Sequence, residues 1–317
     1  MHISLAHVGR LVAVLIATAA WFSEVGRATA QTTPAPPGTV ESGNVPIEIQ
    51  HPSPLDVGRV TFSIGADITT AYFFRGILAE RNGFIWQPYG NLNFILFEGG
   101  DADVIDNVIF SLGSFNSVHS NKTLSDGSGP SNWYEASFMF GPSIAFADYF
   151  SSSVIYLLYT SPNGAFKTSQ EIDLSLGFDD GDFLGAFALQ PLMVWGFELD
   201  KTTFGDTEGI YLQLGVKPST VVFENATYPV TLALPLTLGL SVSNYFEEPG
   251  PNGSNDPFGF FDAGLVASVP LAFLPEDYGA WSVSLSVDVL ALSGTLADFN
   301  RGDGTQWVGK TGFFMSY

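Results

Sequence analysis

Residues Tyr228–Phe246 read Tyr-Pro-Val-Thr-Leu-Ala-Leu-Pro-Leu-Thr-Leu-Gly-Leu-Ser-Val-Ser-Asn-Tyr-Phe. Apolar side chains occupy every second position from Val230 to Val242, and small or weakly polar residues lie between them. A period of two places the two sets on opposite faces of a β-strand. A helix would scatter the same threonine, glycine and proline residues around all its sides. We therefore predict a strand whose apolar face packs on a partner layer in water or contacts acyl chains in a membrane.

The composition of the whole chain suits strands better than helical bundles. The 317 residues are 46% hydrophobic and only 14% charged, with 34 glycines, 28 phenylalanines and no cysteine. Soluble domains carry about 25% charged residues, so the surface is short of charge. The lack of cysteine excludes a disulfide scaffold and a Cys-ligated metal site. The net charge of −21 argues against a nucleic-acid partner, which needs basic patches.

The N-terminal residues are typical of an export signal. Residues 1–30 combine a weakly basic start, a short apolar core and the cleavage pattern Ala28-Thr29-Ala30. Residues 31–59 are rich in proline and without periodicity, which predicts an extended tail or linker; a tail folded into the remaining chain as a plug is the alternative. Residues 60–317 form the third segment.

The two-residue period recurs throughout that third segment. About twelve strands are expected, each near the ~9–11 residues that a tilted strand needs to cross a bilayer. Ser152–Tyr159 is apolar on both faces and its orientation stays open. The expected strands are Val60–Phe74, Phe84–Phe97, Val104–Asn116, Trp133–Ala147, Ser152–Tyr159, Thr168–Phe178, Phe187–Leu199, Ile210–Val216, Tyr228–Phe246, Phe261–Leu271, Trp281–Ala291 and Trp307–Tyr317.

The connections between these strands favour a membrane barrel over a soluble β-sandwich. Alternate connections are longer on one side, for example 117–132 and 244–257, and tight on the other, for example 148–151. This asymmetry is typical of outer-membrane barrels. Aromatic residues fall near strand ends, where interface girdles belong: Trp86, Trp133, Tyr134, Trp195, Trp281 and Trp307. We predict an all-β, antiparallel, up-and-down transmembrane barrel in the cell outer membrane, in contact with its lipid.

The last strand carries a further signal. Phe313, Met315 and Tyr317 alternate up to a terminal aromatic residue. This resembles the C-terminal signature by which outer-membrane barrels are recognised by the barrel assembly machinery, which is therefore an expected partner.

A more specific likeness lies at the end of the first predicted strand. Residues Ala71–Ile77 read Ala-Tyr-Phe-Phe-Arg-Gly-Ile. They resemble the opening Tyr-x-x-Arg-Gly-Ile segment of the TorF-like porin family of Gram-negative bacteria, in which a Ser-Gln-like pair usually follows; here Leu78 and Ala79 follow. The resemblance implies a β-barrel porin and brings no catalytic residues.

Parity along the strands places ionisable side chains on the inward face. Such charges must be hydrated or paired, because lipid contact would cost several kcal/mol for each. Either a narrow, wet, acidic pore or a packed interior salt-bridge network satisfies this requirement, and the small residues of Thr231–Ser241 favour the pore. The inward set is Asp67, Glu135, Glu171, Asp173, Glu198, Asp262 and Asp288 against Arg75, Lys217 and Lys310.

Catalytic and metal-binding patterns are weak. His119, near Ser117 and Ser120, is the only histidine near a strand end, and a lipid-modifying enzyme would need a nucleophile with a histidine partner. Acidic turns such as Asp179/Asp180/Asp182 offer carboxylate oxygens to Ca²⁺, but their spacing is not that of an EF-hand. We expect no enzyme activity, no metal and no cofactor.

The expected function is passive passage of small solutes, with a preference for cations. The alternatives are a non-conducting structural or adhesive barrel and, less favoured, a lipid-modifying enzyme. The sequence leaves open the transported solute, the oligomeric state and whether the lumen is open.

Overall fold

The computed structural model describes residues 58–100, 103–200, 207–224, 226–247 and 255–317. The predicted signal peptide, with Ala28 and Ala30, and nearly all of the predicted tail lie outside these residues. None of the helices in the described ranges has the length and apolar character to span a membrane.

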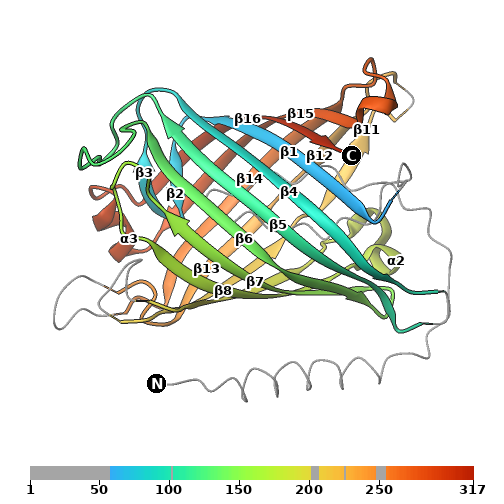
Figure 1. The fold of residues 1–317 in the computed structure, drawn as a ribbon, viewed down its shortest axis with the longest axis horizontal. Helices are drawn as coiled ribbons and strands as arrows, with labels where there is room; N and C mark the ends of the chain where they lie inside the picture. The colour runs from blue at the N-terminus through green and yellow to red at the C-terminus, as the bar shows by residue number, and fades with distance from the viewer. Residues whose placement is uncertain (1–57, 101–102, 201–206, 225, 248–254) are drawn as a thin grey trace.

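The described strands form one closed antiparallel barrel (Figure 1). Neighbouring strands pair in chain order, and β1 pairs with both β4 and β16, which closes the sheet. The barrel segments are β1 (Val60–Thr69), β4 (Ile85–Glu98), β5 (Ile105–His119), β6 (Trp133–Phe146), β7 (Phe150–Thr160), β8 (Ser169–Phe178), β9 (Leu192–Glu198), β10 (Ile210–Val216), β11 (Ser219–Val222), β12 (Val230–Ala233), β13 (Leu236–Ser243), β14 (Phe258–Pro270), β15 (Ala280–Leu292) and β16 (Thr305–Ser316).

These fourteen described segments amount to twelve strands, because β10 with β11 and β12 with β13 each form one interrupted strand. The structure therefore confirms the all-β class, the antiparallel closure and the strand number. Short additional elements are β2 (Tyr72–Phe74), β3 (Ile77–Glu80), α2 (Gly181–Leu184), η1 (Gly185–Phe187), η2 (Glu276–Tyr278) and α3 (Gly294–Phe299). β2, β3 and α3 lie at one end of the barrel, called the far end below, and α2 lies towards the near end (Figure 1).

Burial alternates along the strands as the sequence predicts. On β15, Ser282, Ser286 and Asp288 are buried, whereas Leu285 and Val287 are exposed on the outer surface. The same alternation settles the orientation of β7, where Ile155, Leu157 and Tyr159 are buried and point inward.

The strand around Leu234 is interrupted, contrary to the continuous strand predicted for Tyr228–Phe246. Proline at position 235 has no N–H to give to the ladder. β12 accordingly pairs with β11 and β14, whereas β13 pairs with β10 and β14. The parity survives the break, since Thr237 and Ser241 are buried and Val242 is exposed.

Two further predictions were wrong in detail. The strand predicted from Phe187 begins only at Leu192, because residues 181–187 form α2 and η1. Tyr134 was expected to belong to the aromatic girdle at the membrane interface, but it points inward. The pairing of β5 with β6 is irregular here: Glu135 and Trp133 have partners on β5, but Tyr134 between them has none in the ladder. The Tyr134 ring stacks on the ring of the inward-facing His119, with ring centres 4.8 Å apart.

The pairing of β16 leads to the first testable prediction. Removing Phe313–Tyr317 deletes the partners of Ser63–Ala66 on β1 and of Ala280–Val283 on β15, together with the hydrogen bonds that link Tyr317 and Phe62. Because an open edge cannot be left unpaired in lipid, the shortened chain should fail to close and should accumulate as unfolded precursor. Electrophoresis without heating separates closed barrels from unfolded chains.

Ser316→Ala serves as the control, since it keeps every backbone partner. Normal heat-sensitive migration of the truncated chain would contradict closure through β1 and β16.

Candidate functional site: a hairpin ion-paired inside the barrel

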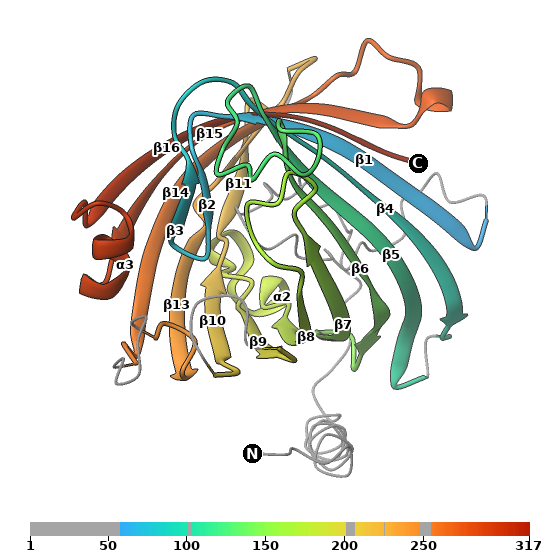
Figure 2. The same ribbon diagram turned by 60° about the vertical axis from the view of Figure 1, so that its left-hand side comes forward.

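The chain turns into the barrel directly after β1, so the first strand is shorter than the predicted Val60–Phe74. β2 pairs only with β3, and the turn between them lies at Arg75 and Gly76, with φ angles of 45° and 86°. Positive φ is uncommon for a side chain as large as arginine. Figure 2, turned so that the far end comes forward, shows this hairpin within the ring of strands.

The Arg75 side chain connects the hairpin tip to β8. Its guanidinium donates to both carboxylate oxygens of Glu171, with Nη1–Oε2 at 2.7 Å and Nη2–Oε1 at 2.5 Å, and Nη2 lies 3.5 Å from Oδ2 of Asp173. Such a two-pronged Arg–carboxylate pair is among the stronger polar contacts in proteins. The side chains of Arg75 and Glu171 are only 1% and 2% exposed, so the pair is shielded from water.

Aromatic side chains surround the same guanidinium. Its Cζ lies 4.1 Å from the ring centre of Tyr211 on β10, and Nη1 donates to the hydroxyl of Tyr245, which follows β13. Tyr211, Tyr245 and Phe246 are all fully buried. Cation–π attraction adds to the ion pair most strongly where water is excluded. The hairpin tip is thereby fixed to β8, to β10 and to the segment that follows β13.

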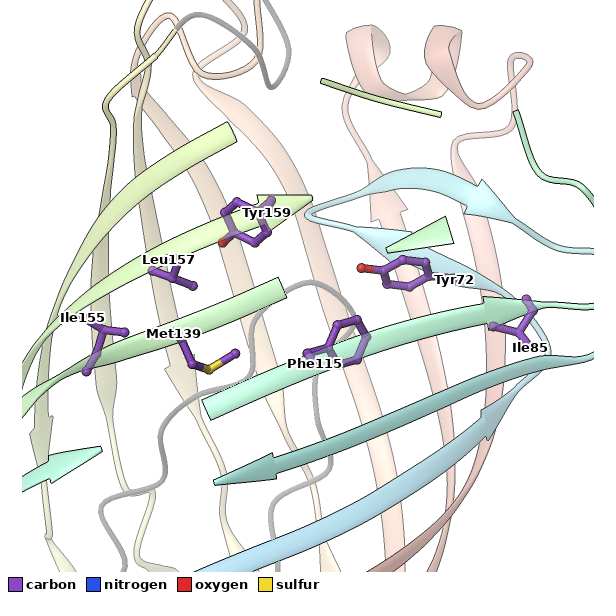
Figure 3. Packing of buried hydrophobic residues seen from close by; sticks show 7 residues of the cluster. All are labelled: Tyr72, Ile85, Phe115, Met139, Ile155, Leu157 and Tyr159. Carbon is purple, nitrogen blue, oxygen red and sulfur yellow. The ribbon is translucent and has the colours of Figure 1, made fainter. Parts of the chain in front are cut away.

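Tyr72 fixes the base of the hairpin to the adjoining wall. Its hydroxyl donates to Oε2 of Glu135 at 2.6 Å, and Ser137 donates to Oε1 of the same carboxylate at 2.7 Å. Figure 3 shows the buried cluster around Tyr72, to which β4, β5, β6 and β7 contribute. Its members are Tyr72, Ile85, Phe115, Met139, Ile155, Leu157 and Tyr159.

The opposite side of the hairpin contacts β15, β16 and α3. Phe73 packs with Leu290 and Val308, while Asn300 donates to the carbonyl of Gly76 at 2.7 Å and accepts from the N–H of Leu78 at 2.8 Å. Gly76 has a φ of 86°, a conformation that other residues adopt only with strain, and a Cβ there would also displace Leu296 Cδ1 at 2.6 Å, so the position favours glycine. The hairpin is therefore held from several sides of the barrel.

A chain of hydrogen bonds links the hairpin to β5. His119 lies between the hydroxyls of Ser117 and Thr123, each 2.8 Å from a ring nitrogen, and Thr123 donates to Glu80 at 2.6 Å. Burial raises the pKa of Glu80, but hydrogen bonds from Thr123 and from the N–H groups of Asn82 and Arg81 outweigh it, so the pKa lies below its usual value. Ser117 and His119 are 0% and 1% exposed.

The remaining charges predicted to line the lumen occupy separate places. Lys310 Nζ lies 3.9 Å from Asp288 Oδ2, and Asp67 faces the same region from β1. Glu198 accepts from the N–H of Gly209 at 2.7 Å. Asp262 on β14 and Lys217, between β10 and β11, are half-buried. Of the ten predicted residues, Arg75, Glu171 and Asp173 form one centre, and Asp288 with Lys310 a second.

The residues of the predicted assembly signature lie at the seam. Phe313 is exposed and lies opposite Ala66 of β1, and Tyr317 is exposed and lies opposite Phe62. Met315, opposite Ile64, is buried.

Sequence reasoning missed the partners of the hairpin. Tyr211, Tyr245 and Asn300 come from distant parts of the chain, and nothing in their local sequence marks them. The one available signal was Arg75 followed by glycine within an aromatic run, a pattern that fits a turn better than a continuing strand.

Comparisons with known proteins agree on the class of architecture. An outer-membrane channel from Pseudomonas putida F1 is similar over 83% of this chain and 97% of its own, with 11% identity and a TM-score of 0.44. The porin NanC matches over 80% and 98%, with 9% identity and a TM-score of 0.38. LpxR from Salmonella typhimurium matches over 80% and 99%, with 6% identity and a TM-score of 0.40.

These scores are too low to carry an argument about function. No family model matches the sequence, and the curated proteins gave no match either. The resemblance of the hairpin tip to TorF-like porins therefore stays a prediction, while this chain is similar in overall fold to barrel proteins of bacterial outer membranes.

Proposed function

We propose that this chain is an outer-membrane channel whose lumen is narrowed by the β2–β3 hairpin and passes small solutes, with a preference for cations. The outer surface supports the membrane location. Large apolar side chains are exposed there, among them Ile64 (48%), Leu285 (64%) and Trp307 (68%). A soluble monomer rarely exposes a continuous apolar surface of this kind, whereas lipid covers it without cost.

The observation that carries the proposal is the hairpin bound inside the barrel by Arg75. A segment that crosses a lumen sets the narrowest point of any path through it. Seven acidic and three basic residues face inward by strand parity and hairpin position, and Arg75 and Lys310 are each paired with a carboxylate. The acidic excess attracts cations in a narrow space.

Planar-bilayer recording tests this function. In a KCl gradient across the bilayer, the reversal potential should favour K⁺ over Cl⁻, and the preference should weaken as ionic strength rises. Asp262→Asn should lower the preference because it removes an inward charge. Asp103→Asn, at an exposed near-end turn, should leave it unchanged.

Anion preference would refute the proposed selectivity. No current at all would favour the second candidate, a non-conducting structural or adhesive barrel. The packing of Tyr72, Phe73 and Arg75 against several walls is the observation that supports that candidate.

We propose no catalytic role. Ser117 and His119 do lie within hydrogen-bond distance, as a nucleophile and its base would. However, both side chains are buried inside the barrel, away from the outer surface where a lipid substrate would bind.

A further inference from the structure

The near end of the barrel wall has a gap between β8 and β11. β9 begins at Leu192, opposite Gly177 near the end of β8 and Gly215 on β10, so β8 and β9 end at the same level. β10, by contrast, is continued past that level by β11. In the described sheet, β11 pairs only with β12. Seven residues at about 3.3 Å each, tilted by about 40°, cover about 18 Å of depth, whereas the apolar band of such barrels is about 25 Å tall.

The α2–η1 segment (residues 181–187) occupies this gap. The ring of Phe183 lies 5.8 Å from that of Phe178 on β8, and η1 contacts β11. Directly after η1, the carbonyl of Leu189 accepts from the N–H of Lys217 at 2.7 Å. The segment therefore bridges the two sides of the gap.

The apolar side chains of this segment are largely exposed. Neither α2 nor η1 contains a buried residue, and Phe183 and Phe187 are 55% and 82% exposed. Asp180 is buried, and its carboxylate accepts from the N–H groups of Leu189 and Gln190 at 2.8–3.0 Å. The acidic group thus stabilises the loop, while Phe187 and more than half of the Phe183 side chain stay exposed on the outside.

The exposed phenylalanines continue the outer surface of the barrel. Phe146, Phe150 and Phe178 point outward from β6, β7 and β8, with ring centres 5.6 Å and 5.0 Å apart. Phe183 extends this row, at 5.0 Å from Tyr149. The row joins the surface that lipid covers under the proposed function.

We infer that α2–η1 inserts into the lipid leaflet at the near end and covers, within the apolar band, the edge of β11 that has no strand partner in the described sheet. This inference rests on the membrane location proposed above. The partner is the acyl and interfacial region of the bilayer, which accepts aromatic side chains and has no need of a specific pocket. Phe187 should lie within the leaflet at the edge of the acyl chains.

Spin labelling tests the inference, and the lack of cysteine makes it direct. Phe187→Cys and Leu184→Cys would each carry a nitroxide in the full-length protein reconstituted into phosphatidylcholine vesicles. Leu285→Cys is the lipid reference, and Leu124→Cys, 70% exposed in a far-end loop, is the water reference. At both α2–η1 positions, molecular oxygen should enhance the relaxation rate of the nitroxide more than a water-soluble nickel chelate does, as at Leu285.

Nickel accessibility equal to that of Leu124 would overturn the inference and place the segment in water. Low accessibility to both reagents together with spin–spin broadening would overturn it in favour of contact between two copies. If Leu285 itself behaves like Leu124, the proposed membrane location fails as well, so the two failures are distinguishable.

Discussion

Replacing Arg75 with methionine is expected to lower the free energy of unfolding by about 3–5 kcal/mol, because it leaves buried carboxylates without their partner. Glu171 would lose both of its guanidinium hydrogen bonds, and Tyr245 would lose its donor. The same change releases the hairpin tip from β8, so a channel that conducts should show larger and noisier currents. Urea unfolding in detergent micelles and single-channel recording measure the two effects.

The chain supplies a matched control on the same hairpin. Arg81 pairs with Asp303 at 3.2 Å, but the two side chains are 32% and 57% exposed. Exposed pairs contribute about 0–1 kcal/mol, so Arg81→Met should change stability little. Adding Glu171→Gln to Arg75→Met should restore part of the lost stability, since it removes one unpaired charge. If Arg75→Met and Arg81→Met lower the free energy of unfolding by the same amount, the buried pair of Arg75 with Glu171 does not hold the hairpin.

A second large effect is expected on the outer face of β15. Leu285 is exposed near the middle of that strand, where arginine would have to enter lipid. Leu285→Arg should destabilise the inserted barrel by about 2–4 kcal/mol, or lower the yield of insertion correspondingly. Unfolding by urea from lipid vesicles measures the change.

The neighbouring residue provides the comparison. Ser284 points inward and lies opposite Gly312 of β16. Asp67 of β1 lies opposite the same glycine on the other side of β16. A Cβ at Gly312 would lie 2.6 Å from Ser284 Oγ and 2.7 Å from Asp67 Oδ1, so an arginine at position 284 can reach the Asp67 carboxylate. Ser284→Arg should therefore insert almost normally. Equal losses for the two variants would contradict the assigned faces.

The strand faces could be predicted because alternation is a property of the local sequence. On β15, serines and valines or leucines alternate almost without exception, and the structure buries one set and exposes the other. A period of two survives local interruptions, which is why Thr237 keeps its face after the break at Pro235.

The hairpin could not be predicted in the same way. Tyr72, Phe73 and Phe74 are as apolar as the outward-facing residues of β1, and hydrophobicity alone does not show that the chain turns inward there. The turn depends on positive φ at Arg75 and Gly76 and on contacts with Glu171, Tyr245 and Asn300, which come from distant parts of the chain. The same limit applies to Tyr134, whose face changed through one irregular pair.

The most direct measurement of the central claim, a barrel with a lipid-facing exterior and a polar lumen, uses single cysteines at the same two positions of β15. In the reconstituted protein, Leu285→Cys should react only with a lipid-soluble thiol reagent, and Ser284→Cys only with a small water-soluble one. Because the natural chain has no cysteine, no background labelling interferes. Protection of Leu285→Cys from the lipid-soluble reagent, or its labelling from water, would contradict a barrel that crosses a membrane.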